Sequence, residues 1–89
     1  MPTISMFYGI LIQMYFRDTG RHHLPHIHAR YQGQAVALAV ADGSVLEGEL
    51  PARQLRMVQV WMDIHRDELL ADWELAVNGD SPYKIAPLQ

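Results

Sequence analysis

The feature that most constrains the fold is a change of sequence pattern at Pro51. Before Pro51, short apolar segments alternate with turn signals, whereas residues 52–77 contain neither glycine nor proline. Pro51 suits the start of a helix, and the pair Asn78–Gly79 suits its end. The sequence therefore predicts strands followed by one helix over Ala52–Val77, about 39 Å long if it is continuous. The alternative is a break near Asp72, which would give two shorter helices.

Four segments before Pro51 have the composition of strands, and two pairs of turn residues, Gln32–Gly33 and Asp42–Gly43, separate the last three. The segments are Ile10–Phe16, His26–Tyr31, Ala35–Val40 and Ser44–Glu49. We therefore expect an α+β fold, a small antiparallel β-meander of three or four strands packed by one long or two shorter C-terminal helices. The last residues, 81–89, contain two prolines and are expected to pack back as an extended segment.

Length and residue types restrict the class of protein. Eighty-nine residues form a single domain, 1–89. The chain has no cysteine, which excludes disulfides and thiolate metal sites. The apolar run Met6–Phe16 is too short to span a bilayer, which takes about 20 helical residues. We expect a cytoplasmic protein that does not associate with membranes.

The charge is unevenly distributed along the chain. Residues 1–41 carry a net charge of +2 and residues 42–89 a net charge of −5. The positive charges of the first part are Arg17, Arg21 and Arg30, which surround the histidines and are candidate anion-binding residues. The net charge of −3 argues against a general nucleic-acid binder, whose footprint is strongly basic.

Four of the five histidines lie within residues 22–28. In the segment His26–Tyr31, strand alternation places His26, His28 and Arg30 on one face. Ile27, Ala29 and Tyr31 then lie on the other face. A two-residue turn at Gln32–Gly33 would pair His28 with Ala37 and His26 with Ala39, and alanines leave room for a ligand. We expect the apolar face to lie against the helix and the histidines to face away from it.

Three interpretations of the histidines stay open. In the first, His26, His28 and His23 bind zinc or another transition metal, with His22 or Asp18 as further candidates, because three protein ligands and a water form a catalytic zinc site. In the second, an imidazole transfers a proton while Arg17, Arg21 and Arg30 hold a phosphate, without metal. In the third, the histidines occupy a solvated strand face and have no chemical role. The catalytic residue is unknown, and the candidates are His26, His28 and His65.

The predicted helix is apolar on two sides. One stripe at 3-4 spacing is expected to face the sheet, with His65 as a partly buried member. A second stripe needs another cover, which is either the C-terminal segment or a second copy of the chain. We expect a two-fold homodimer, the commonest closed assembly. The first stripe is Leu55, Val58, Met62, His65, Leu69, Trp73 and Ala76; the second is Met57, Val60, Trp61 and Ile64.

Several motifs together resemble the bacterial family catalogued as domain of unknown function 4160. They are the opening Met-Pro-Thr-Ile-Ser-x-Phe-Tyr-Gly-Ile (1–10), Met-Tyr-Phe-x-Asp (14–18), Pro-His-Ile-His-Ala (25–29), Leu-Glu-Gly-Glu-Leu-Pro (46–51) and His-Arg-x-Glu-Leu…Trp-Glu-x-Ala…Asn-Gly (65–79). The resemblance covers nearly the whole chain. The loop before Pro25 is longer than is usual in the family, so His22 and His23 match less directly than His26 and His28.

The resemblance implies no activity, but it does imply a genetic setting. Genes of the family often lie beside another small domain, which implies a two-gene cassette of toxin–antitoxin or regulatory type and a small protein from the neighbouring gene as partner. Three function classes therefore remain: a cassette component acting through a protein partner, a hydrolase or nuclease centred on His26 and His28, and a plain interaction module with incidental histidines.

Overall fold

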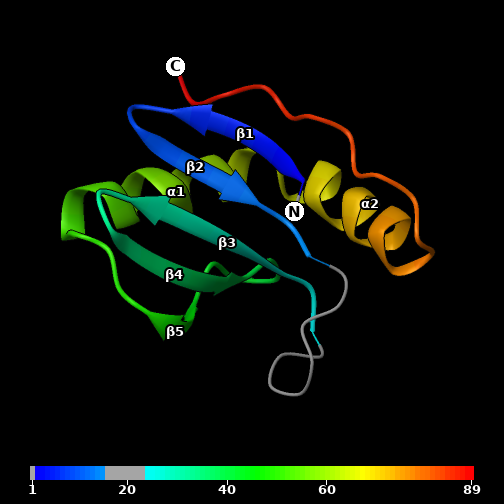
Figure 1. Cartoon of the computed structure of the whole chain (residues 1–89), viewed down its shortest axis with the longest axis horizontal. Coiled ribbons are helices and arrows are strands. Elements are labelled where there is room, and N and C mark those ends of the chain that lie inside the picture. The colour runs from blue at the N-terminus through cyan, green and yellow to red at the C-terminus, as the bar shows by residue number, and fades with distance from the viewer. Residues whose placement is uncertain (1, 16–23) are drawn as a thin grey trace.

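The computed structural model describes residues 2–15 and 24–89 of the chain. Five strands form one antiparallel sheet in the order β1-β2-β3-β4-β5, and two helices follow (Figure 1). The elements are β1 (Thr3–Phe7), β2 (Ile10–Gln13), β3 (His26–Tyr31), β4 (Gln34–Ala39), β5 (Val45–Gly48), α1 (Ala52–Ile64) and α2 (Arg66–Val77). The α+β class is confirmed, whereas the sheet has five strands rather than three or four.

The additional strand is β1, which the sequence pattern does not reveal. It pairs with β2 through a tight turn at Tyr8 and Gly9, which both have positive φ (49° and 77°). A register shift between Thr3 and Ser5 places Ile4 and Ser5 both in buried positions, while Met6 is 65% exposed. This bulge breaks the strict alternation of buried and exposed side chains by which a strand is recognised in a sequence.

The predicted pairing of β3 with β4 is confirmed. His28 lies opposite Ala37 and His26 opposite Ala39. The turn between the strands is the expected pair Gln32–Gly33, with φ of 45° and 82°, the left-handed conformation that two-residue hairpin turns require. Each end of β4 and β5 differs from the prediction by one residue. The predicted strand Ile10–Phe16 is too long, because β2 ends at Gln13 and the described residues 14 and 15 are not part of a strand.

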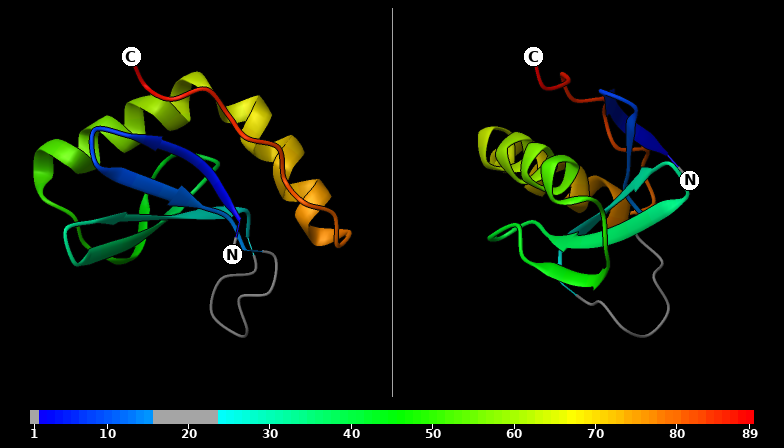
Figure 2. Two further views of the ribbon diagram at one scale, coloured as in Figure 1. Left: turned by 45° about the horizontal axis from the view of Figure 1, so that its top comes forward. Right: turned by 90° about the vertical axis from the view of Figure 1, so that its left-hand side faces the viewer.

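The helical region is broken at His65, not near Asp72. His65 has φ −109° and ψ 23°, yet its N–H bonds to the Trp61 carbonyl and its own carbonyl accepts from Leu69. These two bonds are the last of α1 and the first of α2, so the chain bends at the single residue between the helices, and Asp72 lies inside α2. After the bend, α2 runs past the end of the sheet at which β3 begins (Figures 1 and 2).

The hydrophobic core lies between one face of the sheet and the two helices. The predicted sheet-facing stripe is confirmed, since its apolar members are buried or partly buried. Trp61 was expected on the second stripe but is fully buried, because the indole N–H donates to the Ala86 carbonyl and the C-terminal segment covers it. Ile85 of that segment is 5% exposed, and its N–H bonds to the Ile4 carbonyl of β1. The expected return of the C-terminal residues onto the domain is therefore confirmed.

In the described part of the chain, neither helix is long and apolar enough to cross a membrane.

Candidate functional site

The candidate site lies on the sheet face opposite the core, which we call the histidine face. It is defined by the side chains that share a side with His28 through the strand register: Met6, Leu11, Gln13, His26, His28, Arg30, Ala35, Ala37, Ala39 and Glu47. β3 is the central strand of the sheet, so its side chains have neighbours from strands on both sides. The row through His28 runs from Gln13 of β2 to Ala37 of β4 and Glu47 of β5.

His26 is fully buried, which corrects the expectation of a solvated strand face turned away from the helices. Its ring lies 5.2 Å from the ring of Trp73 in α2, centroid to centroid. The physical reason is the bend at His65, which carries α2 round the end of the sheet and brings Trp73 against the first residue of β3. Strand alternation correctly gives the face of His26 but does not show what covers it.

The contact of His26 with the Leu24 carbonyl shows which ring nitrogen donates a hydrogen bond. Its Nδ1 atom lies 2.8 Å from the carbonyl oxygen of Leu24. A carbonyl oxygen only accepts, so Nδ1 carries the hydrogen, and Nε2 of the neutral ring is a proton acceptor or a metal ligand. A ring held in one tautomer by a backbone carbonyl is the usual arrangement for both roles.

His28 continues a row of rings across the face. Its ring centroid lies 5.2 Å from that of His26 and 4.6 Å from that of Tyr15, and both contacts are edge-on. The row therefore runs from Trp73 through His26 and His28 to Tyr15. Edge-on contacts between rings hold each one in a defined orientation. His28 is partly buried as a residue, but its Nε2 atom is buried.

Gln13 positions two further polar groups beside His28. Its Oε1 atom accepts hydrogen bonds from Arg30 Nε at 3.2 Å and from the Tyr15 hydroxyl at 3.3 Å. Gln13 is 8% exposed, whereas Arg30 is exposed. The site therefore brings together an imidazole, a phenol and a guanidinium, groups that transfer protons and bind anions.

The space opposite the histidines, where alanines were expected to leave room for a ligand, is closed to solvent. Ala37 and Ala39 are each 3% exposed, so the small side chains opposite His28 and His26 do not face solvent. The accessible part of the histidine face is the neighbouring row, in which Met6, Leu11, Arg30 and Ala35 lie side by side on four strands. Met6, Arg30 and Ala35 are exposed and Leu11 is partly exposed.

The metal hypothesis rests on residues beyond those described. Asp18, His22 and His23, like the anion candidates Arg17 and Arg21, lie outside the described residues. Within residues 2–15 and 24–89, no group of three or more His, Asp or Glu side chains is arranged to hold a metal ion. The described chain supplies two neighbouring imidazoles, His26 and His28, and any metal site needs a further ligand.

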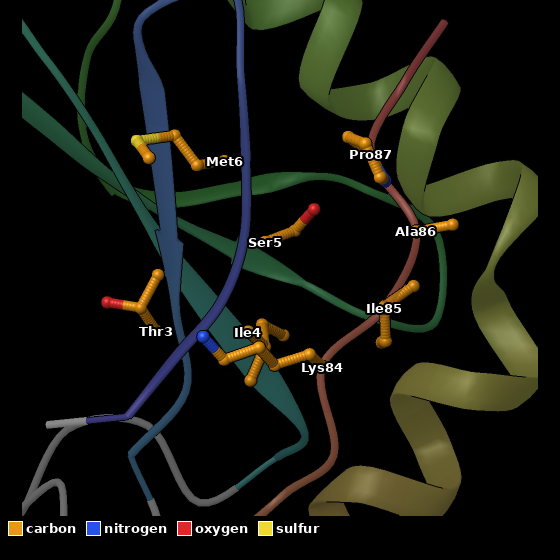
Figure 3. A pocket seen from close by; sticks show the side chains of 8 residues that line it. All are labelled: Thr3, Ile4, Ser5, Met6, Lys84, Ile85, Ala86 and Pro87. Carbon is orange, nitrogen blue, oxygen red and sulfur yellow. The ribbon is translucent and has the colours of Figure 1, made fainter.

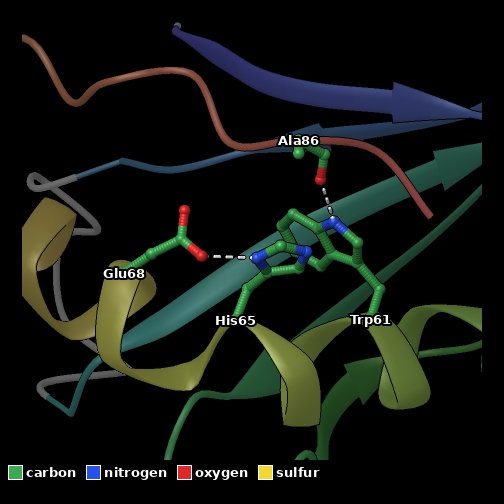
Figure 4. Close-up of polar contacts among 4 residues, drawn as sticks. All are labelled: Trp61, His65, Glu68 and Ala86. Atoms are coloured by element: carbon green, nitrogen blue, oxygen red, sulfur yellow. Dashed lines mark hydrogen bonds and ion pairs between the residues drawn. The ribbon is translucent and has the colours of Figure 1, made fainter.

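His65 lies at the junction of α1 and α2 and has different neighbours from the other candidates. Its Nδ1 atom contacts the Glu68 carboxylate, and its ring centroid lies 5.5 Å from that of Trp61 (Figure 4). The side chain is 15% exposed, as expected for a partly buried helix position. The rings of His26 and His28 contact Trp73 and Tyr15 instead, so we assign His65 to the helix junction.

Three residues of this site were not identified from the sequence: Gln13, Tyr15 and Trp73. Gln13 and Tyr15 alternate on one strand face, but the long connection from β2 to β3 does not fix the register that sets Gln13 opposite His28. Trp73 was assigned to packing alone, because the bend at His65 that directs it toward His26 has no glycine or proline signal. The sequence around His65 therefore does not predict the bend.

A comparison with known protein families gives a match that includes every strand of the histidine face except β1. The family model described as "Domain of unknown function (DUF4160)" matches residues 9–74, from the β1–β2 turn to the second half of α2. No curated protein and no solved structure matches the chain. The matched range includes β2 to β5, all of α1 and the residues Gln13, His26, His28, Arg30 and Trp73. The chain belongs to the DUF4160 family.

Proposed function

We propose that this protein is a component of a two-gene cassette of toxin–antitoxin or regulatory type, and that it acts by binding a protein partner through the histidine face. Membership of the DUF4160 family supports the genetic setting through the gene neighbourhood that the family implies. The partner is then the small protein encoded by the neighbouring gene. Exposed side chains on the histidine face support the choice of this surface.

The observation that carries this assignment is the accessible row of Met6, Leu11, Arg30 and Ala35. Exposed apolar side chains that lie side by side on a soluble protein usually mark a contact with another molecule. Arginine is enriched in protein interfaces, and the hydrogen bond from Arg30 to Gln13 restricts the arginine before any partner arrives. Less side-chain entropy is then lost on binding.

The test is co-expression with the neighbouring gene, followed by purification of this protein and measurement of the co-purified partner. Arg30→Ala and Ala35→Arg should each reduce the recovered partner at least tenfold, because one removes the central charge and the other places a large side chain on the row. Val77→Asp changes an exposed residue at the end of α2 and serves as the matched control. Equal recovery with all three variants would contradict the assignment.

Growth should also depend on the partner. Expression of this protein alone and together with its neighbour should give different growth rates if the two form a toxin–antitoxin pair. Equal growth under both conditions, together with intact co-purification, supports a regulatory complex and rejects toxicity.

A histidine-based hydrolase or nuclease is the second candidate, and the fixed tautomer of His26 favours it. With Nδ1–H bonded to the Leu24 carbonyl, Nε2 of His26 is the proton acceptor. His28 lies next to it. Its ring is partly exposed although its Nε2 atom is buried, so we assign the exposed part of the His28 ring to contact with a substrate and His26 to proton transfer behind it. Arg30 would hold an anionic group of the substrate.

The enzyme candidate is tested by incubating purified protein with single-stranded RNA, with and without a chelator. Cleavage that is lost in His28→Ala but persists in chelator supports acid–base chemistry without metal. Cleavage that stops in chelator and returns with zinc supports the metal hypothesis. Absence of cleavage by the wild type under all these conditions rejects a nuclease that acts on single-stranded RNA.

A further inference from the structure

We propose that the groove between β1 and the C-terminal segment binds an extended acidic peptide strand. The groove is lined by Thr3, Ile4, Ser5 and Met6 from β1 and by Lys84, Ile85, Ala86 and Pro87 from the segment (Figure 3). It goes beyond the function proposed above, because its recognition groups, Ser5 and Lys84, are not part of the histidine face. Met6 borders both surfaces, so the variants of Ser5 and Lys84 test the groove and the variants of Arg30 and Ala35 test the histidine face.

The backbone of β1 is only partly used by the rest of the chain. β1 is an edge strand, so half of its N–H and C=O groups point away from β2. In the described part of the chain, the C-terminal segment makes one backbone hydrogen bond to β1, from Ile85 N–H to the Ile4 carbonyl at 2.7 Å. An extended peptide binds such an edge by completing the ladder of backbone hydrogen bonds.

The C-terminal segment cannot continue that ladder beyond Ile85. The carbonyl of Ala86 is turned toward α1, where it accepts the indole N–H of Trp61 at 2.8 Å. Pro87 has no N–H to donate. In the described part of the chain, the segment therefore makes no backbone hydrogen bond to β1 after Ile4.

Ser5 supplies an unmatched polar group inside the groove. The residue is 7% exposed, and its Oγ atom is buried without a hydrogen-bond partner in the described structure. Figure 3 shows its side chain pointing from β1 toward the C-terminal segment. A buried hydroxyl without a partner is costly, and a backbone N–H or C=O of an entering peptide would satisfy it.

The size and charge of the groove define the occupant. Its volume of about 380 Å³ lies within the range of about 300–1,000 Å³ that is usual for ligand pockets. Lys84 is the one charged side chain among the eight lining residues, and it extends across β1 (Figure 3). An edge strand that can add a further strand, beside a single cation, fits an extended peptide that carries a carboxylate.

The test is nuclear magnetic resonance of the full, isotope-labelled chain with a pool of blocked, acidic heptapeptides of alternating β-branched and variable residues. Shift changes confined to residues 3–6 and 84–87 are expected. No change with the pool at millimolar concentration, or changes elsewhere only, would overturn the site. The same pool with N-methylated backbone amides should bind at least tenfold more weakly, because it cannot form the ladder, and equal binding also overturns the proposal.

Two variants examine the recognition groups, and one provides a control. Ser5→Ala should weaken binding of the acidic pool about five- to tenfold, since one hydrogen bond contributes about 1 kcal/mol. Lys84→Glu should weaken the acidic pool and strengthen a basic pool. Ser81→Ala removes an exposed hydroxyl and should leave both affinities unchanged. Unchanged binding in both Ser5→Ala and Lys84→Glu, with both variants folded, would contradict a site at this groove.

Discussion

The indole N–H of Trp61 donates to the carbonyl oxygen of Ala86 at 2.8 Å and so joins the middle of α1 to the C-terminal segment (Figure 4). Trp61 is fully buried, and its ring also packs at 5.4 Å from Phe7 of β1. One side chain thus connects α1, the edge of the sheet and the last residues of the chain. The C-terminal segment, which follows the two helices in sequence, therefore forms part of the hydrophobic core.

Trp61→Phe should lower the free energy of unfolding by about 1–3 kcal/mol, measured by urea denaturation. The substitution removes one buried hydrogen bond, worth about 0.5–1.5 kcal/mol, and leaves a small cavity. Tyr83→Phe alters an exposed aromatic of the same segment and is the control, with little change expected. A Trp61→Phe protein as stable as the wild type would show that the contact with Ala86 does not stabilise the fold.

Ile27→Ala and His28→Ala should differ strongly in stability. Ile27 is fully buried in the core, so its truncation should cost about 2–5 kcal/mol. His28 lies on the opposite face and is only partly buried, so its truncation should cost less than about 1 kcal/mol, a size typical of substitutions away from the core. Equal losses in thermal or urea unfolding would mean that the two faces of β3 contribute alike to the core.

Asp72 should make the protein less stable as the pH rises. Burial raises the pKa of the Asp72 carboxyl, with a further contribution from the charge of Glu68, while the N–H of Tyr83 opposes the shift. The folded chain therefore holds this proton more tightly than the unfolded chain. Stability falls as the pH rises from about 4 through the folded-state pKa, and the cost is complete above it.

Asp72→Asn keeps the acceptor for Tyr83 N–H, 2.9 Å away, but carries no charge. The variant should therefore unfold at a higher temperature than the wild type near pH 7, and the difference should shrink toward about pH 4. Asp67→Asn, on the exposed part of α2, is the control and should show no such trend. A lower unfolding temperature for Asp72→Asn at neutral pH would mean that the ionised carboxylate stabilises the fold.

The homodimer stays a prediction, now restricted to fewer residues. With Trp61 covered by the C-terminal segment, Val60 (53% exposed) and Ile64 (64% exposed) remain on the outer side of α1, in a groove flanked by Arg56, Asp63 and Arg66. Light scattering at tens of micromolar should give twice the chain mass of 10.2 kDa, and Ile64→Asp should halve it. Val77→Asp is the control. A wild-type monomer would show that this surface does not pair with itself.

Local signals in the sequence predict most of the fold. The turn at Gln32–Gly33 fixes the pairing of β3 with β4, and the stretch without glycine or proline gives the outer ends of the helical region correctly. The bulge between Thr3 and Ser5 conceals β1, because it interrupts the alternation that identifies strands. The bend at His65 is not encoded by a helix breaker, so the sequence pattern does not locate it.

The candidate site was predictable only in part for the same reasons. The alternation of side chains along a strand predicts that His26, His28 and Arg30 share a face, because alternation is set by consecutive residues alone. The burial of His26 depends on Trp73, which is distant in the sequence and reaches β3 only because α2 changes direction. The link from Arg30 to Gln13 depends on the register of β2 against β3, which a long connection leaves unspecified.

The central claim, that the protein binds a partner through the histidine face, is tested most directly by titrating the isotope-labelled chain with the purified product of the neighbouring gene. Nuclear magnetic resonance then reports which residues change. We predict that the largest shift changes map to Leu11, Arg30 and Ala35 and are absent in Ala35→Arg. No binding, or changes restricted to the outer side of α1 around Val60 and Ile64, would contradict the claim.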